Sequence, residues 1–169
     1  ADEISRNLTK PNKPAWREIL RVFGKEFLLN DKNLDRKKIA GEVFRKKRKL
    51  QLINKIMHPR ILAQIGRDVK KVRKENPDSI IIVDAPLLIE LGYNRFAEKI
   101  IVVYADRKTQ IERMIKRDKI SKAEALLRLK SQIPVSEKIK FADYVIKSSG
   151  LKKDTLKTVK QVFSKLSSL

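Results

Sequence analysis

The sequence has no cysteine and only one histidine, His58, among its 169 residues. Without cysteine there are no disulfide bonds and no thiolate metal sites, and a single histidine argues against a zinc site. The five glycines are scattered, so the phosphate-binding loop G-x-x-x-x-G-K-[ST] does not occur. No apolar run approaches the length of a membrane span. These absences exclude disulfide-stabilised scaffolds and membrane-spanning helices from this sequence.

Acidic residues are scarce beside basic ones. There are 41 Lys and Arg residues against 20 Asp and Glu residues, which gives a formal net charge of +21. Such an excess predicts polyanionic partners, namely nucleotide phosphates, nucleic acid or an anionic membrane surface. The segment 36–55 carries nine basic residues and one acid, Glu42. As a solvated helical face this segment needs no function, and the alternative is a surface that faces phosphate or RNA.

Apolar spacing and capping residues predict helices in the first half of the chain. Pro14 suits a first helical turn, Gly24 suits the position after a helix, and Asp35 suits an N-cap. The proline at position 59 suits the start of a new helix, with His58 between two helices. The predicted helices cover residues 2–8, 14–23, 35–44, 46–57 and a segment from Pro59 to about residue 76.

Ile80 to Val83 are four consecutive β-branched residues, which predict a strand buried on both faces of a parallel sheet. Two further strands are predicted at residues 100–104 and 144–146. Helices are predicted at residues 107–118 and 121–132, the second with a capping box of Ser121 and Glu124, and from residue 153 onward. The alternation of strands and helices predicts a parallel α/β sheet. Ligands bind beyond the carboxyl ends of such strands, where Asp84 lies, and the alternative is that a buried strand simply ends in Asp.

Three arginines follow the predicted strand at residues 100–104. Arg113 and Arg117 lie four residues apart on one helix, so their side chains point the same way. Together with Arg128 they could surround a triphosphate, and the alternative is that they are solvated surface residues. For His58, the alternative to a ligand-binding role is a structural histidine with its hydrogen bonds satisfied.

Taken in order, the motifs form a recognisable series. They are Asp2…Arg6, Phe23-Gly24, Asp35-Arg36, Val43-Phe44, His58-Pro59, Asp84-Ala85-Pro86-Leu87-Leu88-Ile89-Glu90, Gln110…Arg113…Arg117-Asp118, Gln132, Lys138 and Ala142-Asp143-Tyr144. This series resembles the dephospho-CoA kinase family of P-loop kinases of the nucleoside-monophosphate-kinase type, over nearly the whole chain. The resemblance implies an α/β, parallel-sheet P-loop NTP hydrolase fold in a single domain, residues 1–169. A helical acceptor-binding insertion is expected at about 8–76 and a lid at about 113–135.

The resemblance also implies a reaction, which is transfer of the ATP γ-phosphoryl group to the ribose 3′-hydroxyl of dephospho-CoA with Mg²⁺ bridging the phosphates. Asp2 matches the acid near the acceptor hydroxyl, and Arg113 and Arg117 match lid residues that spread over the phosphates. The family's Asn-x-Gly adenine-side position holds Ser148-Ser149-Gly150, a departure from the pattern, and no residue is matched as a metal ligand. The acceptor-side positions are matched by Arg6, His58, Pro86, Leu87, Leu88 and Glu90.

The absent phosphate-binding loop is the largest departure from the family. In the family, the first strand and the glycine-rich loop precede the matched region, so we expect a chain truncated at its N-terminus. Three explanations stay open: the segment exists outside this sequence, a separate chain supplies it, or the protein is an inactive, basic relative in an RNA-rich assembly. We expect an intracellular protein, in the cytoplasm or alternatively in mitochondria, and leave its oligomeric state open.

Overall fold

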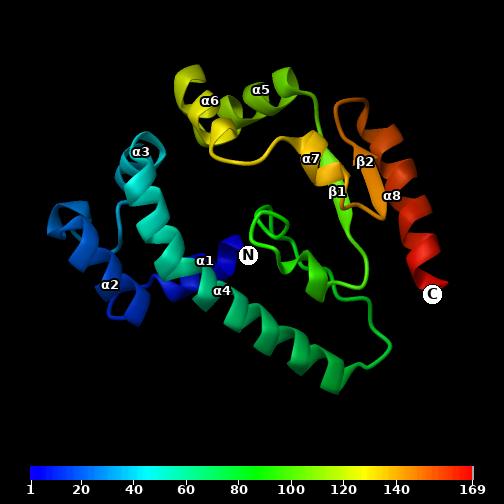
Figure 1. Ribbon diagram of the computed structural model, residues 1–169, viewed down its shortest axis with the longest axis horizontal. Helices are drawn as coiled ribbons and strands as arrows, with labels where there is room; N and C mark the ends of the chain where they lie inside the picture. Colours follow the sequence, from blue (N-terminus) through cyan, green and yellow to red (C-terminus); the bar gives the residue numbers. More distant parts are fainter. Residues whose placement is uncertain (169) are drawn as a thin grey trace. The chain divides into compact units, whose positions relative to one another are not determined.

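The computed structural model describes residues 1–168, and the chain forms two compact units, Ala1–Ala85 and Pro86–Leu169 (Figure 1). The first unit is helical, and the second holds the sheet. Whether residues 1–169 act as one functional domain, as the sequence predicts, stays a prediction. Among the described residues, no helix is both long enough and apolar enough to cross a membrane.

The first unit is built around one long helix. Helices α1 (Asp2–Leu8), α2 (Pro14–Phe23) and α3 (Arg36–Arg45) all pack against α4 (Lys47–Glu75), and a 3-10 turn, η1 (Lys25–Phe27), follows α2. The local signals act as predicted. Gly24 ends α2 with φ +98°, in the left-handed region that favours glycine. Asp35 caps α3 by accepting a hydrogen bond from the Lys38 backbone nitrogen at 2.9 Å.

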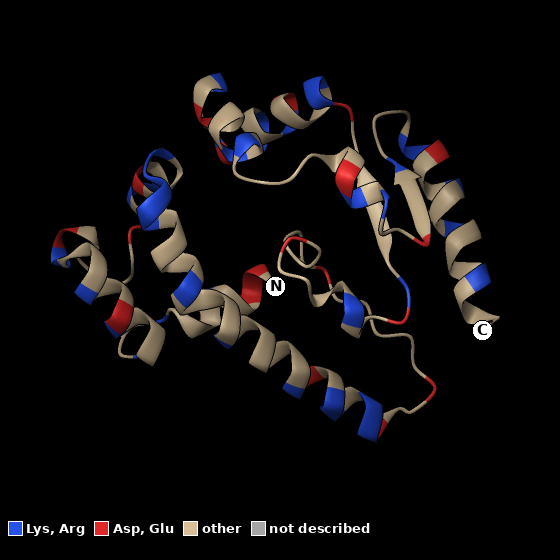
Figure 2. Cartoon of the chain, in the orientation of Figure 1, with Lys and Arg blue, Asp and Glu red and all other residues tan. Residues whose placement is uncertain are grey.

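The core of the first unit fixes these helices on α4. Ile19 and Phe23 of α2, Val43 of α3 and Ile56 of α4 are all buried in one cluster. The ring of Phe23 meets that of Phe27 edge to face, with ring centroids 5.6 Å apart. Basic residues occur on α3 and toward both ends of α4 (Figure 2). The apolar core therefore sets where the charged faces point.

The helix α4 runs through Pro59 without interruption, so the prediction of two helices, with His58 between them, is wrong. Pro59 has no N–H and leaves the carbonyl of Lys55 without its intrahelical bond, a loss of about 3 kcal/mol in an isolated helix. The side chain of Arg60, the next residue, donates through Nη1 to the Ile56 carbonyl at 2.6 Å. Its Nη2 is 2.6 Å from Oε2 of Glu18 on α2, which ties this part of α4 to the core.

The predicted strand Ile80–Val83 is also wrong. These residues form no strand, and Ile82 is 73% exposed. A strand exists only when a neighbouring segment completes its hydrogen-bond ladder. Within the described residues 1–168, no segment pairs with Ile80–Val83. The apolar pattern alone was therefore not sufficient to form a strand.

The second unit carries a two-stranded parallel sheet. Strand β1 (Ile101–Tyr104) pairs with β2 (Tyr144–Lys147), with Val102 opposite Val145. Between the strands come α5 (Arg107–Asp118), α6 (Lys122–Lys130) and α7 (Val135–Ile139), and α8 (Lys152–Ser167) packs on β2. The short turn η2 (Tyr93–Phe96) precedes β1. A parallel pair needs such a crossover, and the prediction of a parallel α/β sheet is confirmed.

Details of the second unit differ from the sequence predictions. Helix α6 ends at Lys130 rather than near Gln132, and α7 was not predicted. Strand β1 is buried on one side only, because Val102 is 6% exposed and Val103 is 60% exposed. The capping box of Ser121 and Glu124 is confirmed.

The cap of α3 yields a stability prediction. We expect Asp35→Ala to lower the free energy of unfolding by about 1 kcal/mol, because the Lys38 backbone N–H loses its acceptor. Asp35→Asn keeps a side-chain oxygen there and should stay within about 0.5 kcal/mol of the original protein. Urea denaturation followed by circular dichroism measures both. Equal losses in the two variants would contradict a capping role.

Candidate functional site

In the first unit, α1 carries two of the predicted site residues. Asp2 and Arg6 lie four residues apart and so share one face of this helix. Both are exposed, and neither side chain makes an ion pair or hydrogen bond within residues 1–168. The backbone nitrogen of Ala1 donates to the Asp84 carbonyl at 2.8 Å, which places the first turn of α1 beside Asp84. The carboxylate of Asp2 is thus available to a ligand.

His58 lies on α4, the helix against which α1 packs. It is partly buried and has interactions of its own within the protein. The structure therefore places Asp2, Arg6 and His58 in one unit, on two helices in contact.

In the second unit, Glu90 is the centre of a buried polar cluster. Its Oε1 lies 3.0 Å from Nζ of Lys138 and accepts from the Ile133 backbone nitrogen at 3.1 Å. The two side chains are only 13% and 14% exposed. Lys138 Nζ also donates to the Pro86 carbonyl at 3.0 Å and to Gln132 at 3.3 Å. This cluster ties the Pro86–Glu90 loop to the segment before and within α7.

The Glu90 carboxylate has one oxygen that is not satisfied. Its Oε2 is buried and has no hydrogen-bond partner within the described residues. A buried carboxylate oxygen without a donor is uncommon. Because Oε2 has no donor, the ion pair of Oε1 with Lys138 is the main interaction that compensates the buried charge of Glu90. Leu87 and Leu88 lie in the same loop, where the backbone nitrogens of Leu91 and Tyr93 donate to their carbonyls at 3.1 and 3.0 Å.

Arg113 lies at the carboxyl ends of the two strands. Its Nη2 donates to the Ser148 carbonyl at 2.5 Å and its Nη1 to the Ser148 hydroxyl at 3.2 Å. That hydroxyl donates to the Tyr104 carbonyl at 3.0 Å, so one arginine links α5 to the last residues of both strands. The loop that contains Ser149 and Gly150 is thereby held beside the N-terminus of α5.

Asp106 caps α5 in this same region. Its carboxylate accepts from the Thr109 backbone nitrogen at 2.8 Å, and its own backbone nitrogen donates to the Ser149 hydroxyl at 2.8 Å. Hydrogen bonds from the Thr109 backbone first, and then from the Ser149 and Thr109 side chains, lower the pKa of Asp106 to about 2. The carboxylate is therefore charged at every physiological pH.

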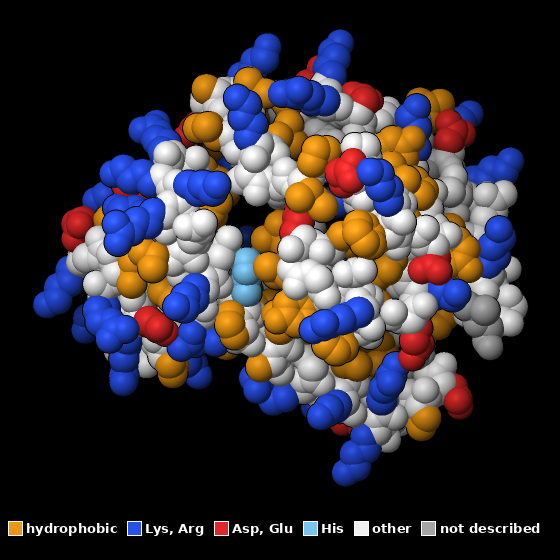
Figure 3. Space-filling model, viewed as in Figure 1, with side chains coloured by type: hydrophobic (Ala, Val, Ile, Leu, Met, Phe, Trp, Pro, Cys, Tyr) orange, Lys and Arg blue, Asp and Glu red, His pale blue; other side chains and the backbone are white. Residues whose placement is uncertain are grey.

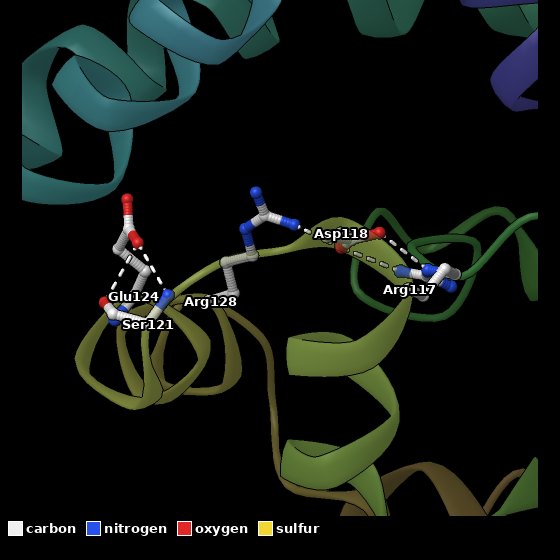
Figure 4. A network of polar contacts seen from close by, with 5 residues as sticks. All are labelled: Arg117, Asp118, Ser121, Glu124 and Arg128. Carbon is white, nitrogen blue, oxygen red and sulfur yellow. Dashed lines mark hydrogen bonds and ion pairs between the residues drawn. The ribbon is translucent and has the colours of Figure 1, made fainter.

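Arg117 and Arg128 converge on one carboxylate, that of Asp118 (Figure 4). Arg117 donates to it through Nε at 2.8 Å and Nη2 at 3.1 Å, and Arg128 through Nη1 at 2.5 Å. The hydrogen bond from Arg117 is the main cause that lowers the pKa of Asp118, and the charge of Arg128 adds to it. Arg117 is 76% exposed, whereas Arg128 is 27% exposed. The two guanidinium groups are held together at one end of the 113–135 segment.

The arginines of α5 thus have separate partners. Arg113 and Arg117 were predicted to point to one ligand because they lie four residues apart. In the structure Arg113 binds Ser148, whereas Arg117 binds Asp118. Side chains as long as arginine can reach different neighbours from one helix face.

Metal binding by the protein alone is not indicated. No group of three or more His, Cys, Asp or Glu side chains that could hold a metal ion occurs in residues 1–168. The expectation that no residue of this sequence is a metal ligand stays a prediction. Mg²⁺ is usually bound through one or two carboxylates together with substrate phosphates, so it does not require such a group.

The order of motifs and the geometry can be compared with known proteins. The family model described as dephospho-CoA kinase matches residues 1–154. The chain belongs to the dephospho-CoA kinase family. Its members are ATP-dependent kinases, and the prediction of the family is confirmed.

Individual dephospho-CoA kinases match nearly the whole chain. That of Syntrophus aciditrophicus is 36% identical over 165 residues, 98% of this chain and 70% of the relative. That of Aquifex aeolicus is 37% identical over 166 residues, 98% of this chain and 83% of the relative. No finding supports the alternative of an inactive, RNA-associated relative.

Solved structures confirm the P-loop kinase fold class. The dephospho-CoA kinase from Campylobacter jejuni matches with a TM-score of 0.67 and 31% identity, over 99% of this chain and 83% of that chain. A Thermus thermophilus protein of known crystal structure matches with a TM-score of 0.73 and 25% identity, over 98% of this chain and 82% of that chain.

Sequence reasoning missed several partners of the dephospho-CoA kinase site residues. Lys138, Ser148 and Asp118 each bind a predicted site residue, but they lie at very different distances along the chain from it. Asp118 follows Arg117 directly and could have been found as its neighbour. Two other pairings depend on the tertiary fold, and no local pattern predicts them. They are Glu90 with Lys138 and Arg113 with Ser148.

The buried ion pair of Glu90 and Lys138 yields a second prediction. Glu90→Ala leaves the ammonium group of Lys138, 14% exposed, without its carboxylate. We expect the free energy of unfolding to fall by about 3 kcal/mol, measured by urea denaturation. As a control, Glu137→Ala removes the exposed ion pair with Lys140 and should cost less than about 1 kcal/mol. A loss of equal size in both variants would show that burial does not matter here.

The pKa of Asp106 yields a third prediction. Its value of about 2 lies below the value of about 4 expected for an unfolded chain. Because the folded pKa is the lower one, the stabilisation by Asp106 is complete above about pH 4 and disappears as the pH falls through about 2. A carboxyl NMR titration should give a midpoint near 2 for Asp106. Ser149→Ala should raise this midpoint and Ser79→Ala should not. A midpoint near 4 in the original protein would contradict the hydrogen-bonding account.

Proposed function

We propose that this chain transfers the γ-phosphoryl group of ATP to the 3′-hydroxyl of dephospho-CoA, with Asp2 as the residue that binds and orients that hydroxyl. The observation that carries the assignment is a carboxylate on α1 with no ion pair in residues 1–168, on the same helix face as Arg6. An acid that accepts a hydroxyl proton must be able to approach it within hydrogen-bond distance. A carboxylate without competing partners meets this requirement. Membership of the dephospho-CoA kinase family supports the choice of substrates.

Transfer of this kind depends mainly on positioning and charge. The transition state is loose, so the base contributes less than the groups that align the two substrates and neutralise the phosphates. On this proposal Asp2 accepts the hydroxyl proton as the bond to phosphorus forms. Arg6 and His58 bind the acceptor from α1 and α4. ADP leaves with the pair of electrons of the broken bond.

The lid proposal concerns the 113–135 segment. Arg117, with Arg128 beside it, would pass from Asp118 to the phosphates of ATP, since guanidinium groups bind carboxylate and phosphate with the same geometry. Arg113 holds the loop of Ser149 and Gly150, which we assign to the adenine side. The assignment of Arg113 is supported by its bonds to the Ser148 hydroxyl and carbonyl, which hold it at the carboxyl ends of the strands.

The acceptor loop has a separate support. We assign Pro86, Leu87 and Leu88 to acceptor binding, and the ion pair of Glu90 with Lys138 keeps the loop in place. Glu90 then acts as a positioning residue. For the helical region of about 8–76 we likewise propose a role in acceptor binding. Mg²⁺ would enter as its complex with ATP and shield the phosphate charges, and the residues described supply no cage for it.

The test of this function is a pair of substitutions on α1. We expect Asp2→Asn to lower kcat for CoA formation by at least about 100-fold, because a general base contributes this much or more. Circular dichroism and thermal unfolding should be unchanged. Glu3→Gln removes the other acid of the same helical turn and should alter kcat by less than about twofold. Turnover of Asp2→Asn at the original rate would contradict the assignment of Asp2.

A further inference from the structure

Arg36, the first residue of α3, is bound to the end of α1. Its Nη2 donates to the hydroxyl oxygen of Thr9, the residue that follows α1. The Thr9 hydroxyl in turn donates to the Ser5 carbonyl at 2.8 Å and contacts the Arg6 carbonyl at 3.4 Å. The guanidinium of Arg36 therefore sits at the helical turn that carries Arg6.

Thr9 is a fixed support for this arginine. Thr9 is 4% exposed, and it is the polar residue that is buried within residues 1–168. The hydroxyl donates to the helix, and this directs a lone pair toward Arg36 and helps to hold the arginine in place. One N–H of the guanidinium is used in this contact, and the others stay available as donors.

The charges around Arg36 are unusual for a structural arginine. No carboxylate lies within ion-pair distance of Arg36 or of Arg6 in residues 1–168. Desolvation is the main cause that lowers the pKa of Arg36, and the charge of Arg6 is the second. Arg36 nevertheless remains protonated at any physiological pH. Two like charges that lie close together without a counter-ion are destabilising by themselves, and an anion that binds both removes this cost.

Other basic residues of the first unit do not share these features. Lys46 and Lys49 pair with Glu42, and Arg60 pairs with Glu18. Lysines and arginines cover much of the visible surface, as Figure 3 shows, so positive charge alone identifies no site. The pair of Arg6 and Arg36 is distinguished by its buried hydroxyl support, Thr9.

We propose that Arg6 and Arg36 form a two-guanidinium site for the phosphate groups of the acceptor, with Thr9 as the residue that positions Arg36. This inference rests on the proposed function, because Arg6 shares its helix face with Asp2. Dephospho-CoA carries a diphosphate away from the hydroxyl that reacts, and guanidinium groups bind such oxygens through paired hydrogen bonds. Arg36 then contributes to acceptor affinity, and Asp2 to the chemical step.

Kinetics of the full-length protein test the assignment. Arg36→Ala should raise KM for dephospho-CoA by about ten- to hundredfold, the effect of losing charged hydrogen bonds to a phosphate. KM for ATP and kcat should change by less than about threefold. Arg36→Lys keeps the positive charge but loses the paired N–H donors of the guanidinium group. Its KM for dephospho-CoA should lie between those of the original protein and Arg36→Ala. Lys37→Ala, the matched control, removes an adjacent exposed charge and should leave KM unchanged. Thr9→Val should raise the same KM by a smaller factor.

A binding experiment separates this inference from the proposed function. Calorimetric titration with dephospho-CoA should show weaker binding to Arg36→Ala, whereas titration with adenosine, which has no phosphate, should show no difference. If the original protein forms no CoA but binds dephospho-CoA in an Arg36-dependent manner, the proposed function fails and the phosphate site stands. If KM for dephospho-CoA is unchanged in Arg36→Ala, if KM for ATP rises instead, or if Lys37→Ala has the same effect, the inference is overturned.

Discussion

Carboxylates limit how this chain can be held together. There are 20 acidic residues against 41 basic ones, and some carboxylates bind more than one cation. Glu42 binds Lys46 and Lys49, and Asp118 binds Arg117 and Arg128. Where an acid is buried, as Glu90 is, the element that supplies its partner becomes fixed to it. Many basic residues are left without an acid, and these can bind anions from outside the protein.

The two units are stabilised in different ways, and the small number of carboxylates contributes to this difference. In the first unit, an apolar core holds the helices on α4, and ion pairs such as that of Arg60 with Glu18 add to it. Asp2 on α1 has no ion pair in residues 1–168. In the second unit the sheet has two strands, and polar contacts link the loops at the strand ends. The residues assigned to substrate binding are thus supported by different forces. Helix packing supports Asp2 and Arg6, whereas ion pairs and hydrogen bonds support Glu90 and Arg113.

Elements whose causes lie within a few residues were predictable from the sequence. The start of α2 at Pro14, its end at Gly24 and the caps of α3 and α6 follow from local chemistry. The structure of the segment Ile80–Val83 was not predictable in this way, because a strand forms only with a partner segment that completes its hydrogen bonds. Pro59 was misread because α4 continues through it, and the packing of α1, α2 and α3 on α4 is tertiary structure that a local rule does not include. The family and its residues followed from the order of the motifs, but their partners, such as Lys138, depend on the tertiary structure.

Arg117 and Arg128 both bind the carboxylate of Asp118, and this affects which anions can displace that carboxylate. An incoming ion must replace a carboxylate that already binds two guanidinium groups, so a chloride ion, with its single charge and no fork of oxygens, gains nothing from the exchange. A polyphosphate chain offers several charged oxygens at once and can satisfy both groups together. Under the proposed lid function, this arrangement would favour a polyphosphate over small anions. In the structure, Asp118 offsets the repulsion between the two cations that bind it.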